Sequence, residues 1–273
     1  GNDYVLIDAR HMDADWPELA RAMCHRRFSA GADGLLLVLP SEAAHVRMRM
    51  FNPDGSEAEM CGNGIRCLTR YVLERGIVDP GTGPLNVETM AGVRAVESIW
   101  SDGRVTQARV AMGEPELRAD MVPVALPEGS FMGLVLDYPL TVEGVELKLT
   151  FVSMGNPHAV AFIDTPVEDF PLHQIGPIVE RHPIFPRQVN FSVVNVEDWV
   201  RLSARVWERG AGETLACGTG ACAIAVASRV HDYTDDDVDI ALPGGVLGVT
   251  WAGSGQVYLE GPVEEVFEGE WRG

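Results

Sequence analysis

The chain repeats itself at a spacing of 156 residues, and this repeat constrains the fold more than any other feature of the sequence. Cys61–Gly64 and Cys217–Gly220 share the pattern C-G-x-G, and each follows a glutamate by four residues, Glu57 in the first copy and Glu213 in the second. The same offset aligns the apolar and basic residues that precede each motif. The sequence therefore predicts an internal duplication of about 150 residues in which each copy is one structural unit.

The repeat sets the expected domain boundaries. We expect an N-terminal half over residues 1–116, completed by residues 262–273, and a C-terminal half over residues 117–261. The segment Glu114–Gly129 is rich in proline and charge, which predicts a crossover between the two halves.

The local pattern around each motif is the same. His45–Phe51 and Arg201–Trp207 alternate polar and apolar residues, which predicts a half-buried strand in each copy. A polar loop containing glycine follows, and a helix is expected from each C-G-x-G. The first helix should end near Gly76, whereas the second, Ala221–Ala227, is apolar on all sides and is expected to be a buried central helix wrapped by sheet.

Further short strands complete the expected sheets. They are Asn86–Thr89, Arg104–Met112, Asp239–Leu242 and Gln256–Glu260. The predicted fold class is α/β, or more closely an α+β roll, in which two similar domains each have a mixed β-sheet rolled around a central helix and the active site lies in the cleft between them.

Composition excludes several classes of function. The chain has 273 residues and a net charge of −19, which disfavours nucleic acid as a partner because such proteins need a basic surface. No apolar run is long enough to span a membrane, and no signal peptide is visible, so a cytoplasmic location is expected. Lys148 is the only lysine and lies in an ordinary alternating segment, which disfavours a Schiff-base or pyridoxal-phosphate mechanism.

The five cysteines do not form a recognisable framework. An odd number without an export signal argues against a set of disulfides, and no C-x-x-C pair or histidine cluster suggests a metal site. Cys24, Cys67 and Cys222 lack the context of the repeated motif, and we expect them to be core residues. A disulfide between Cys61 and Cys217 remains an alternative role for those two residues.

The repeated motif supports acid–base chemistry. The unpaired N–H groups of a first helical turn bind anions, and the glycines allow a carboxylate to approach the backbone. The same partial positive charge favours a thiolate, so each cysteine is expected to be a usable base. Two such helix ends directed at one carboxylate would place its α-carbon between two sulfurs, Cys61 and Cys217. One sulfur would remove the α-proton and the other would return a proton to the opposite face, without a cofactor or metal.

Four segments of the sequence together resemble diaminopimelate epimerase. They are Phe51–Ser56, Met60–Cys67, Ser153–His158 and Glu208–Gly220, the last of which reads E-R-G-A-G-E-T-L-A-C-G-T-G. The resemblance covers nearly the whole chain. It implies interconversion of L,L- and meso-diaminopimelate, a step in lysine and peptidoglycan-precursor biosynthesis, and a homodimer of the duplicated fold.

The resemblance also implies roles for individual residues. Cys61 corresponds to the base for the L,L substrate and Cys217 to the proton donor. The implied substrate-binding residues are Asn2, Asn52, Gly62, Asn63, Asn156, Asn190, Glu208, Arg209, Gly218 and Thr219. A guanidinium can pair with the distal carboxylate of diaminopimelate, while glutamate and amide oxygens can accept from its ammonium group. His158 is expected either to orient a neighbour in the site or to be a satisfied buried histidine.

Two alternatives remain at this point. An amino-acid racemase of the proline racemase type would also use two cysteines, but it binds a cyclic imino acid without a second charged end, which Asn190, Glu208 and Arg209 disfavour. A phenazine-biosynthesis-like isomerase or a non-catalytic binding protein of the same fold would be expected to lack one or both cysteines.

Overall fold

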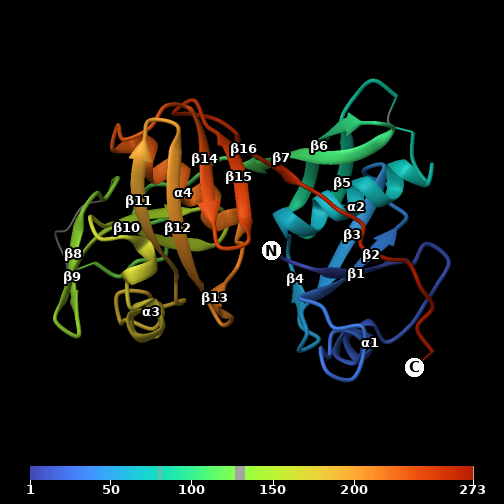
Figure 1. Cartoon of the computed structure of the whole chain (residues 1–273), viewed down its shortest axis with the longest axis horizontal. Helices are drawn as coiled ribbons and strands as arrows, with labels where there is room; N and C mark the ends of the chain where they lie inside the picture. The colour runs from blue at the N-terminus through green and yellow to red at the C-terminus, as the bar shows by residue number, and fades with distance from the viewer. Residues whose placement is uncertain (80, 127–132, 273) are drawn as a thin grey trace. The chain divides into compact units, whose positions relative to one another are not determined.

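The structure of the chain is a computed structural model that describes residues 1–79, 81–126 and 133–272 (Figure 1). The chain divides into two compact units. The N-terminal unit comprises Asn2–Ala111 and Glu260–Gly273, and the C-terminal unit comprises Met112–Leu259 together with Gly1. The halves expected from the repeat, 1–116 with 262–273 and 117–261, stay a prediction.

The described part of the N-terminal unit contains strands of a mixed sheet and two helices. Its strands are β1 (Tyr4–Asp8), β2 (Gly34–Leu39), β3 (Val46–Phe51), β4 (Glu57–Ala58), β5 (Leu85–Thr89), β6 (Gly92–Ser101) and β7 (Arg104–Gly113). They lie in the order β1-β2-β3-β5-β6-β7, with β4 paired to β3. The helices are α1 (Trp16–Met23) and α2 (Gly62–Glu74).

The C-terminal unit has the same kind of sheet with more strands. They are β8 (Tyr138–Val142), β9 (Val145–Ser153), β10 (Pro157–Phe162), β11 (Asn190–Asp198), β12 (Arg201–Glu208), β13 (Gly212–Thr214), β14 (Asp237–Leu242), β15 (Gly245–Thr250) and β16 (Val257–Pro262). Their order is β16-β15-β14-β12-β11-β10-β9-β8, and β13 pairs with β12. The helices are the 3-10 turn η1 (Val167–Asp169), α3 (Leu172–Glu180) and α4 (Gly218–Val230).

The two sheets repeat one topology in matching register. β1 pairs parallel with β2 and β2 antiparallel with β3, as β10 does with β11 and β11 with β12. Leu35 lies opposite Phe51 in the first unit, and Phe191 lies opposite Trp207 in the second, so the offset of 156 residues holds for both partners. The predicted fold class, a duplicated mixed α/β fold, is confirmed.

The helix that follows each C-G-x-G motif packs against the sheet of its own unit. α2 contacts β1, β2, β3 and β6, and α4 contacts β9, β10, β11, β14 and β15 (Figure 1). α2 ends as predicted, because Gly76 follows it with a left-handed φ of 61°. α4 is buried on all sides from Gly220 to Ser228, which confirms the prediction of a central helix. None of the helices in the described part of the chain is long and apolar enough to cross a membrane.

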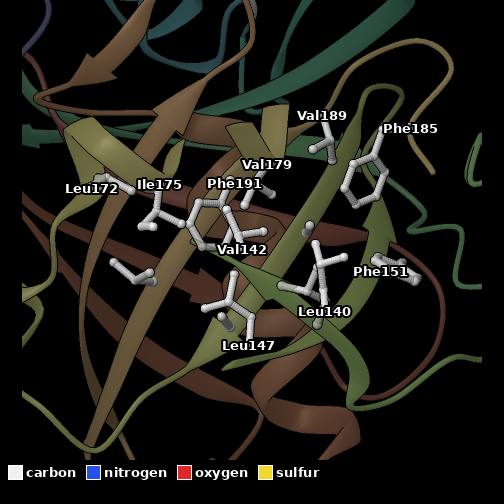
Figure 2. Close-up of a cluster of buried hydrophobic side chains, with 14 of the residues drawn as sticks. Leu140, Val142, Leu147, Phe151, Leu172, Ile175, Val179, Phe185, Val189 and Phe191 are labelled. Carbon is white, nitrogen blue, oxygen red and sulfur yellow. The ribbon is translucent and has the colours of Figure 1, made fainter. Parts of the chain in front are cut away.

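A second helix in each unit covers the other face of the sheet, and the sequence analysis did not predict either one. In Figure 2, Leu172, Ile175 and Val179 of α3 point toward Phe191 of β11. In the N-terminal unit, α1 packs on β2 and β3 in the corresponding way. These helices are short, and Pro177 lies inside α3, which weakens its helical signal.

The predicted crossover Glu114–Gly129 is partly described. Glu116 forms an isolated antiparallel bridge with Ser153, and Arg118 forms one with Leu134. Residues 127–129 of the predicted crossover lie outside the described residues. The described part runs along the C-terminal unit without a helix of its own.

Candidate active site

Each cysteine of the repeated motif caps the N-terminus of a helix. Cys61 precedes α2 with an extended backbone (φ −139°, ψ 116°), and Cys217 precedes α4 in nearly the same conformation (φ −130°, ψ 111°). The Sγ atom of Cys61 accepts a hydrogen bond from the N–H of Gly64 at 3.3 Å, and that of Cys217 accepts one from Gly220 at 3.3 Å. The sulfur thus takes the place of the oxygen of an ordinary Ser or Asp cap, at the positive end of the helix dipole.

The first-turn positions of both helices are the predicted carboxylate-binding residues. α2 begins with Gly62 and Asn63, and α4 begins with Gly218 and Thr219. The N–H groups at these positions have no acceptor within the helix itself, so they can bind an anion beside the sulfur.

The last glycine of each motif lies close to its surroundings. A Cβ atom added at Gly220 would lie 3.1 Å from both Cβ and Sγ of Cys217. At Gly64 the nearest atom would be a Leu36 methyl carbon at 3.0 Å, whereas Cys61 Cβ would be 3.5 Å away. The glycine at this position therefore makes room for the thiol in the C-terminal copy and for the core in the N-terminal copy.

Tyr4 contacts Cys61. Its hydroxyl oxygen lies 3.0 Å from the Cys61 Sγ atom, and the half-buried ring belongs to the first residue of β1. Burial, and then the neighbouring Cys61, raise the pKa of the Tyr4 hydroxyl well above its usual value. The sequence analysis missed Tyr4. The repeat offered a signal for Tyr4. It pairs with Gly34 in the first unit as His158 pairs with Asn190 in the second, and His158 and Asn190 were both predicted site residues.

A polar network lies beside α2 in the N-terminal unit. The Asn63 amide donates to Asn2 Oδ1 at 2.5 Å, and the Asn2 amide donates to the Asp33 carboxylate at 2.9 Å. Arg26 pairs with both Asp33 and Asp3, which holds Asp33 in place. The structure thus brings Asn2 and Asn63 together, as two members of one network.

Asn52 takes part in the loop between β3 and β4. Its backbone N–H donates to the carbonyl of Ser56 at 2.8 Å, and its side-chain amide donates to the Ser56 hydroxyl at 3.0 Å. Within the described residues, the Asn52 hydrogen bonds thus stay inside its own turn, and Asn52 is not a member of the network that joins Asn2 to Asn63.

Cys217 is almost fully buried, at 5% exposure. Burial, followed by the charge of Glu208, raises the pKa of the Cys217 thiol well above its usual value, against the opposing hydrogen bonds from Gly220 and Thr219. The expectation that the helix end favours a thiolate is wrong for Cys217, because desolvation and the nearby carboxylate outweigh the helix dipole. Cys217 therefore holds its proton at neutral pH.

Asn156 links His158 to the first turn of α4. The Asn156 amide donates to the Thr219 hydroxyl at 3.3 Å, which repeats the contact of Asn2 with Asn63. His158 is fully buried, and its Nε2 atom lies 3.1 Å from Asn156 Oδ1. Burial, with a smaller contribution from Arg209, lowers the pKa of His158 to about 3, so the ring is neutral. His158 is buried, but its Nδ1 atom has no hydrogen-bond partner among the described residues, so the expectation of a satisfied buried histidine is wrong, and its orienting role stays a prediction.

The loop after β12 is tied to β11. The buried Asn190 side chain accepts from the backbone N–H of Arg209 at 2.9 Å and donates to the carbonyl of Pro157 at 2.9 Å. The Arg209 side chain is exposed, and one of its N–H groups donates to the Arg187 carbonyl at 3.1 Å. Glu208 accepts from the Thr214 hydroxyl at 2.5 Å. Asn190 therefore sets the backbone of the loop that presents Glu208 and Arg209.

The two upstream glutamates have a supporting role. Glu57 forms a two-bond ion pair with Arg49 at 2.6 and 2.8 Å, and Glu213 forms the same pair with Arg205 at 2.7 and 2.9 Å. These pairs link β3 to β4 and β12 to β13, just before each cysteine. They hold the loop that leads into the motif.

The prediction that the three cysteines outside the repeated motif are core residues is right for two of them. All five cysteines are free thiols. Cys24 and Cys222 are buried core residues, but Cys67 is only half-buried, so the prediction for Cys67 is wrong. Cys67 lies on α2, near enough to Tyr4 for its charge to act on that hydroxyl. Within residues 1–79, 81–126 and 133–272, no group of three or more His, Cys, Asp or Glu side chains could hold a metal ion.

Comparison with known proteins identifies a family. The family model described as diaminopimelate epimerase matches residues 1–118 and 150–266. A protein of Moorella thermoacetica named diaminopimelate epimerase is 50% identical over 273 residues, which cover 99% of this chain and 95% of that protein. Another of the same name from Desulfitobacterium hafniense is 47% identical over 275 residues, with 98% and 94% coverage.

Solved structures share the fold at low sequence identity. A Bacillus anthracis phenazine biosynthesis protein of the PhzF family matches with a TM-score of 0.64 and 19% identity, covering 97% of this chain and 92% of that chain. A probable proline racemase from Agrobacterium radiobacter, with bound carbonate, matches with a TM-score of 0.67 and 18% identity, covering 93% and 80%. These likenesses concern the fold alone.

Proposed function

We propose, from the premise that this chain belongs to the diaminopimelate epimerase family, that it interconverts L,L- and meso-diaminopimelate with two cysteines as acid and base. The single observation that carries the proposal is the repeated cap. Cys61 and Cys217 occupy equivalent N-cap positions, each with one helix N–H on its sulfur at 3.3 Å. The relatives share the name of this activity over nearly the whole chain, which favours diaminopimelate over a cyclic imino acid.

In the proposed reaction the Cys61 thiolate removes the α-proton of the L,L substrate. The C–H bond breaks, an S–H bond forms, and the electron pair moves into the α-carboxylate. The thiol of Cys217 then gives its proton to the opposite face of the carbon, which inverts the centre and leaves Cys217 as the thiolate for the reverse reaction. The raised pKa of Cys217 suits this role, because it keeps a proton available for donation at neutral pH.

The helix ends supply electrostatic stabilisation in this proposal. The N–H groups of Gly62, Asn63, Gly218 and Thr219 would bind the reacting carboxylate, whose charge grows as the proton leaves. At the offset of 156 residues, Asn52 in the first copy corresponds to Glu208 in the second, so the two copies offer different side chains at this position. Diaminopimelate has one amino-acid end that is inverted and one that is not, so the two copies are expected to bind different groups. We assign the end that does not react to Asn156, Asn190, Glu208 and Arg209.

The experiment that tests the function compares three cysteine variants. Cys61→Ala and Cys217→Ala should each lose at least the 10²–10⁴-fold typical of one acid–base group, measured as conversion of L,L-diaminopimelate and as α-hydrogen exchange in D₂O by NMR. Cys24→Ala is the matched control, since Cys24 lies in the α1 core of the N-terminal unit and should retain activity. A Cys217→Ala enzyme with more than about a hundredth of the wild-type rate would contradict the two-thiol mechanism.

Substrate identity is tested separately. Wild-type enzyme should convert L,L-diaminopimelate and leave L-proline unchanged, and efficient racemisation of proline would overturn the assignment. A role in lysine and peptidoglycan-precursor biosynthesis, a cytoplasmic location, a homodimer and independence of any cofactor stay predictions of the family resemblance.

A further inference from the structure

The sulfur of Cys61 has two hydrogen-bond partners on different elements. The N–H of Gly64 lies on α2, and the hydroxyl of Tyr4 lies on β1, at 3.3 and 3.0 Å from Sγ. The strand that carries Tyr4 is fixed by its parallel pairing with β2, where Tyr4 lies opposite Gly34. The hydroxyl therefore has a defined place beside the sulfur.

Tyr4 stays protonated beside this sulfur. Its hydroxyl has a pKa held well above the usual value by burial and by Cys61, so it does not ionise at neutral pH. An O–H group can donate to a thiolate and can accept from a thiol by rotation of its hydrogen. The contact can thus persist in both protonation states of Cys61, and it is strongest when the sulfur carries charge.

We propose that Tyr4 is a positioning residue for Cys61, whose hydroxyl donates a hydrogen bond to the Cys61 thiolate, favours that charged form and orients the sulfur for proton abstraction. The proposal rests on the proposed function, in which Cys61 is the base for the L,L substrate. It adds a residue that acts through Cys61 and does not itself contact the substrate.

In the C-terminal copy the hydroxyl beside the sulfur belongs to Thr219 on α4 itself, 3.7 Å from the Cys217 Sγ atom. His158 occupies the position equivalent to Tyr4, but it bonds to Asn156 and not to the thiol. The acidic side chain Glu208 raises the pKa of Cys217 instead. Cys61 therefore contacts a hydroxyl on another element at 3.0 Å, whereas the hydroxyl beside Cys217 is more distant and belongs to the helix that Cys217 caps.

Other groups around Tyr4 are left unchanged by the test. The titratable groups that act on Tyr4 besides Cys61 are Cys67 on α2 and Asp33 before β2, and the charged Arg66 acts on Cys67. Tyr4→Phe keeps the ring and all of these groups, and it removes only the hydroxyl. A change in the ionisation of Cys61 in this variant can then be assigned to the hydrogen bond.

The test measures the thiol itself. The rate of Cys61 alkylation by iodoacetamide, followed by peptide mass mapping from pH 5 to 10, reports its thiolate fraction without turnover. Tyr4→Phe should alkylate about tenfold more slowly at neutral pH, as expected for loss of one hydrogen bond to a charged group. The acid limb of the pH profile of kcat/KM should move to higher pH by about one unit, which corresponds to the same tenfold change. Tyr71→Phe is the control, because Tyr71 stacks with Arg75 on α2 and should leave both profiles unchanged.

A second variant tests the same bond in the opposite direction. Replacing the five tyrosines by 3-fluorotyrosine keeps the fold and makes the hydroxyl a stronger donor, so Cys61 should alkylate faster at low pH than in wild type. An unchanged alkylation profile in Tyr4→Phe, or a shift in the same direction in both enzymes, would overturn the role of Tyr4. Full activity of Cys61→Ala would instead refute the proposed function, whatever the alkylation profile of the Tyr4 variants.

Discussion

Alanine at the last glycine of each motif should have opposite consequences in the two copies. Gly→Ala within a helix ordinarily stabilises it by about 0.5–1 kcal/mol. At Gly220 the added Cβ would lie 3.1 Å from the Cys217 sulfur, whereas comfortable contacts begin at about 3.5 Å. The sulfur must therefore move by about half an ångström. Because a displacement of about 1 Å costs roughly 10²-fold, Gly220→Ala should lose about tenfold in kcat.

The same change at Gly64 meets a different neighbour. There the added Cβ would lie 3.0 Å from a methyl group of the fully buried Leu36, while Cys61 Cβ is at an ordinary 3.5 Å. Gly64→Ala should then lower the free energy of unfolding by about 1–3 kcal/mol, as overpacking does, and leave kcat within a few-fold of wild type.

The two variants are compared by urea unfolding and by initial rates on L,L-diaminopimelate in both directions of epimerisation. Gly220→Ala should be a well-folded, slow enzyme, and Gly64→Ala a less stable enzyme of nearly normal rate. If both variants lose activity equally, or if Gly220→Ala has the wild-type kcat, the sulfur of Cys217 is not confined as these contacts indicate.

Two other side chains give sharp predictions. His158 is neutral when folded, with a pKa of about 3, so the unfolded chain binds one more proton below pH 6.5 and stability falls as the pH falls. Because of this group, the free energy of unfolding should decline by up to about 1.4 kcal/mol for each pH unit below 6.5. In His158→Gln, the free energy of unfolding measured by urea titration from pH 6.5 to 4 should decline less steeply by that amount. Arg209→Met should lower kcat/KM for diaminopimelate by about 10–100-fold, as for a lost charge-assisted bond, and change the low activity on L-lysine little. Equal losses on both substrates would mean that Arg209 supports its loop and does not bind the distal carboxylate.

The repeat carried most of what could be predicted about the fold. One offset aligned two strand pairs, and the structure has Phe51 opposite Leu35 and Trp207 opposite Phe191 as that offset requires. It also placed both cysteines at helix starts. The alternation of a strand and the caps of a helix are local properties, so they are visible in one sequence.

The missed features depend on contacts between distant segments. Tyr4 meets Cys61 across 57 positions of the chain, and nothing near Tyr4 in the sequence indicates a thiol. The pKa of Cys217 depends on burial and on Glu208, two effects that the helix start alone does not reveal. α1 and α3 also pack on the sheet through apolar side chains, and these contacts with distant segments are not visible in the local sequence.

The ends of the N-terminal unit have a consequence for how the protein is made. Arg66 and Arg70 on α2 donate to the carbonyls of Pro262 and Val263, so the first unit is completed by a segment that is synthesised after the second unit. The second unit is nearly continuous, from Met112 to Leu259. On the ribosome, where early segments usually fold first, the later half of this chain can become native while the earlier half still waits for its final segment. Emergence of the segment after β16, and not of the first hundred residues, then sets the moment at which the helix that follows Cys61 acquires these bonds.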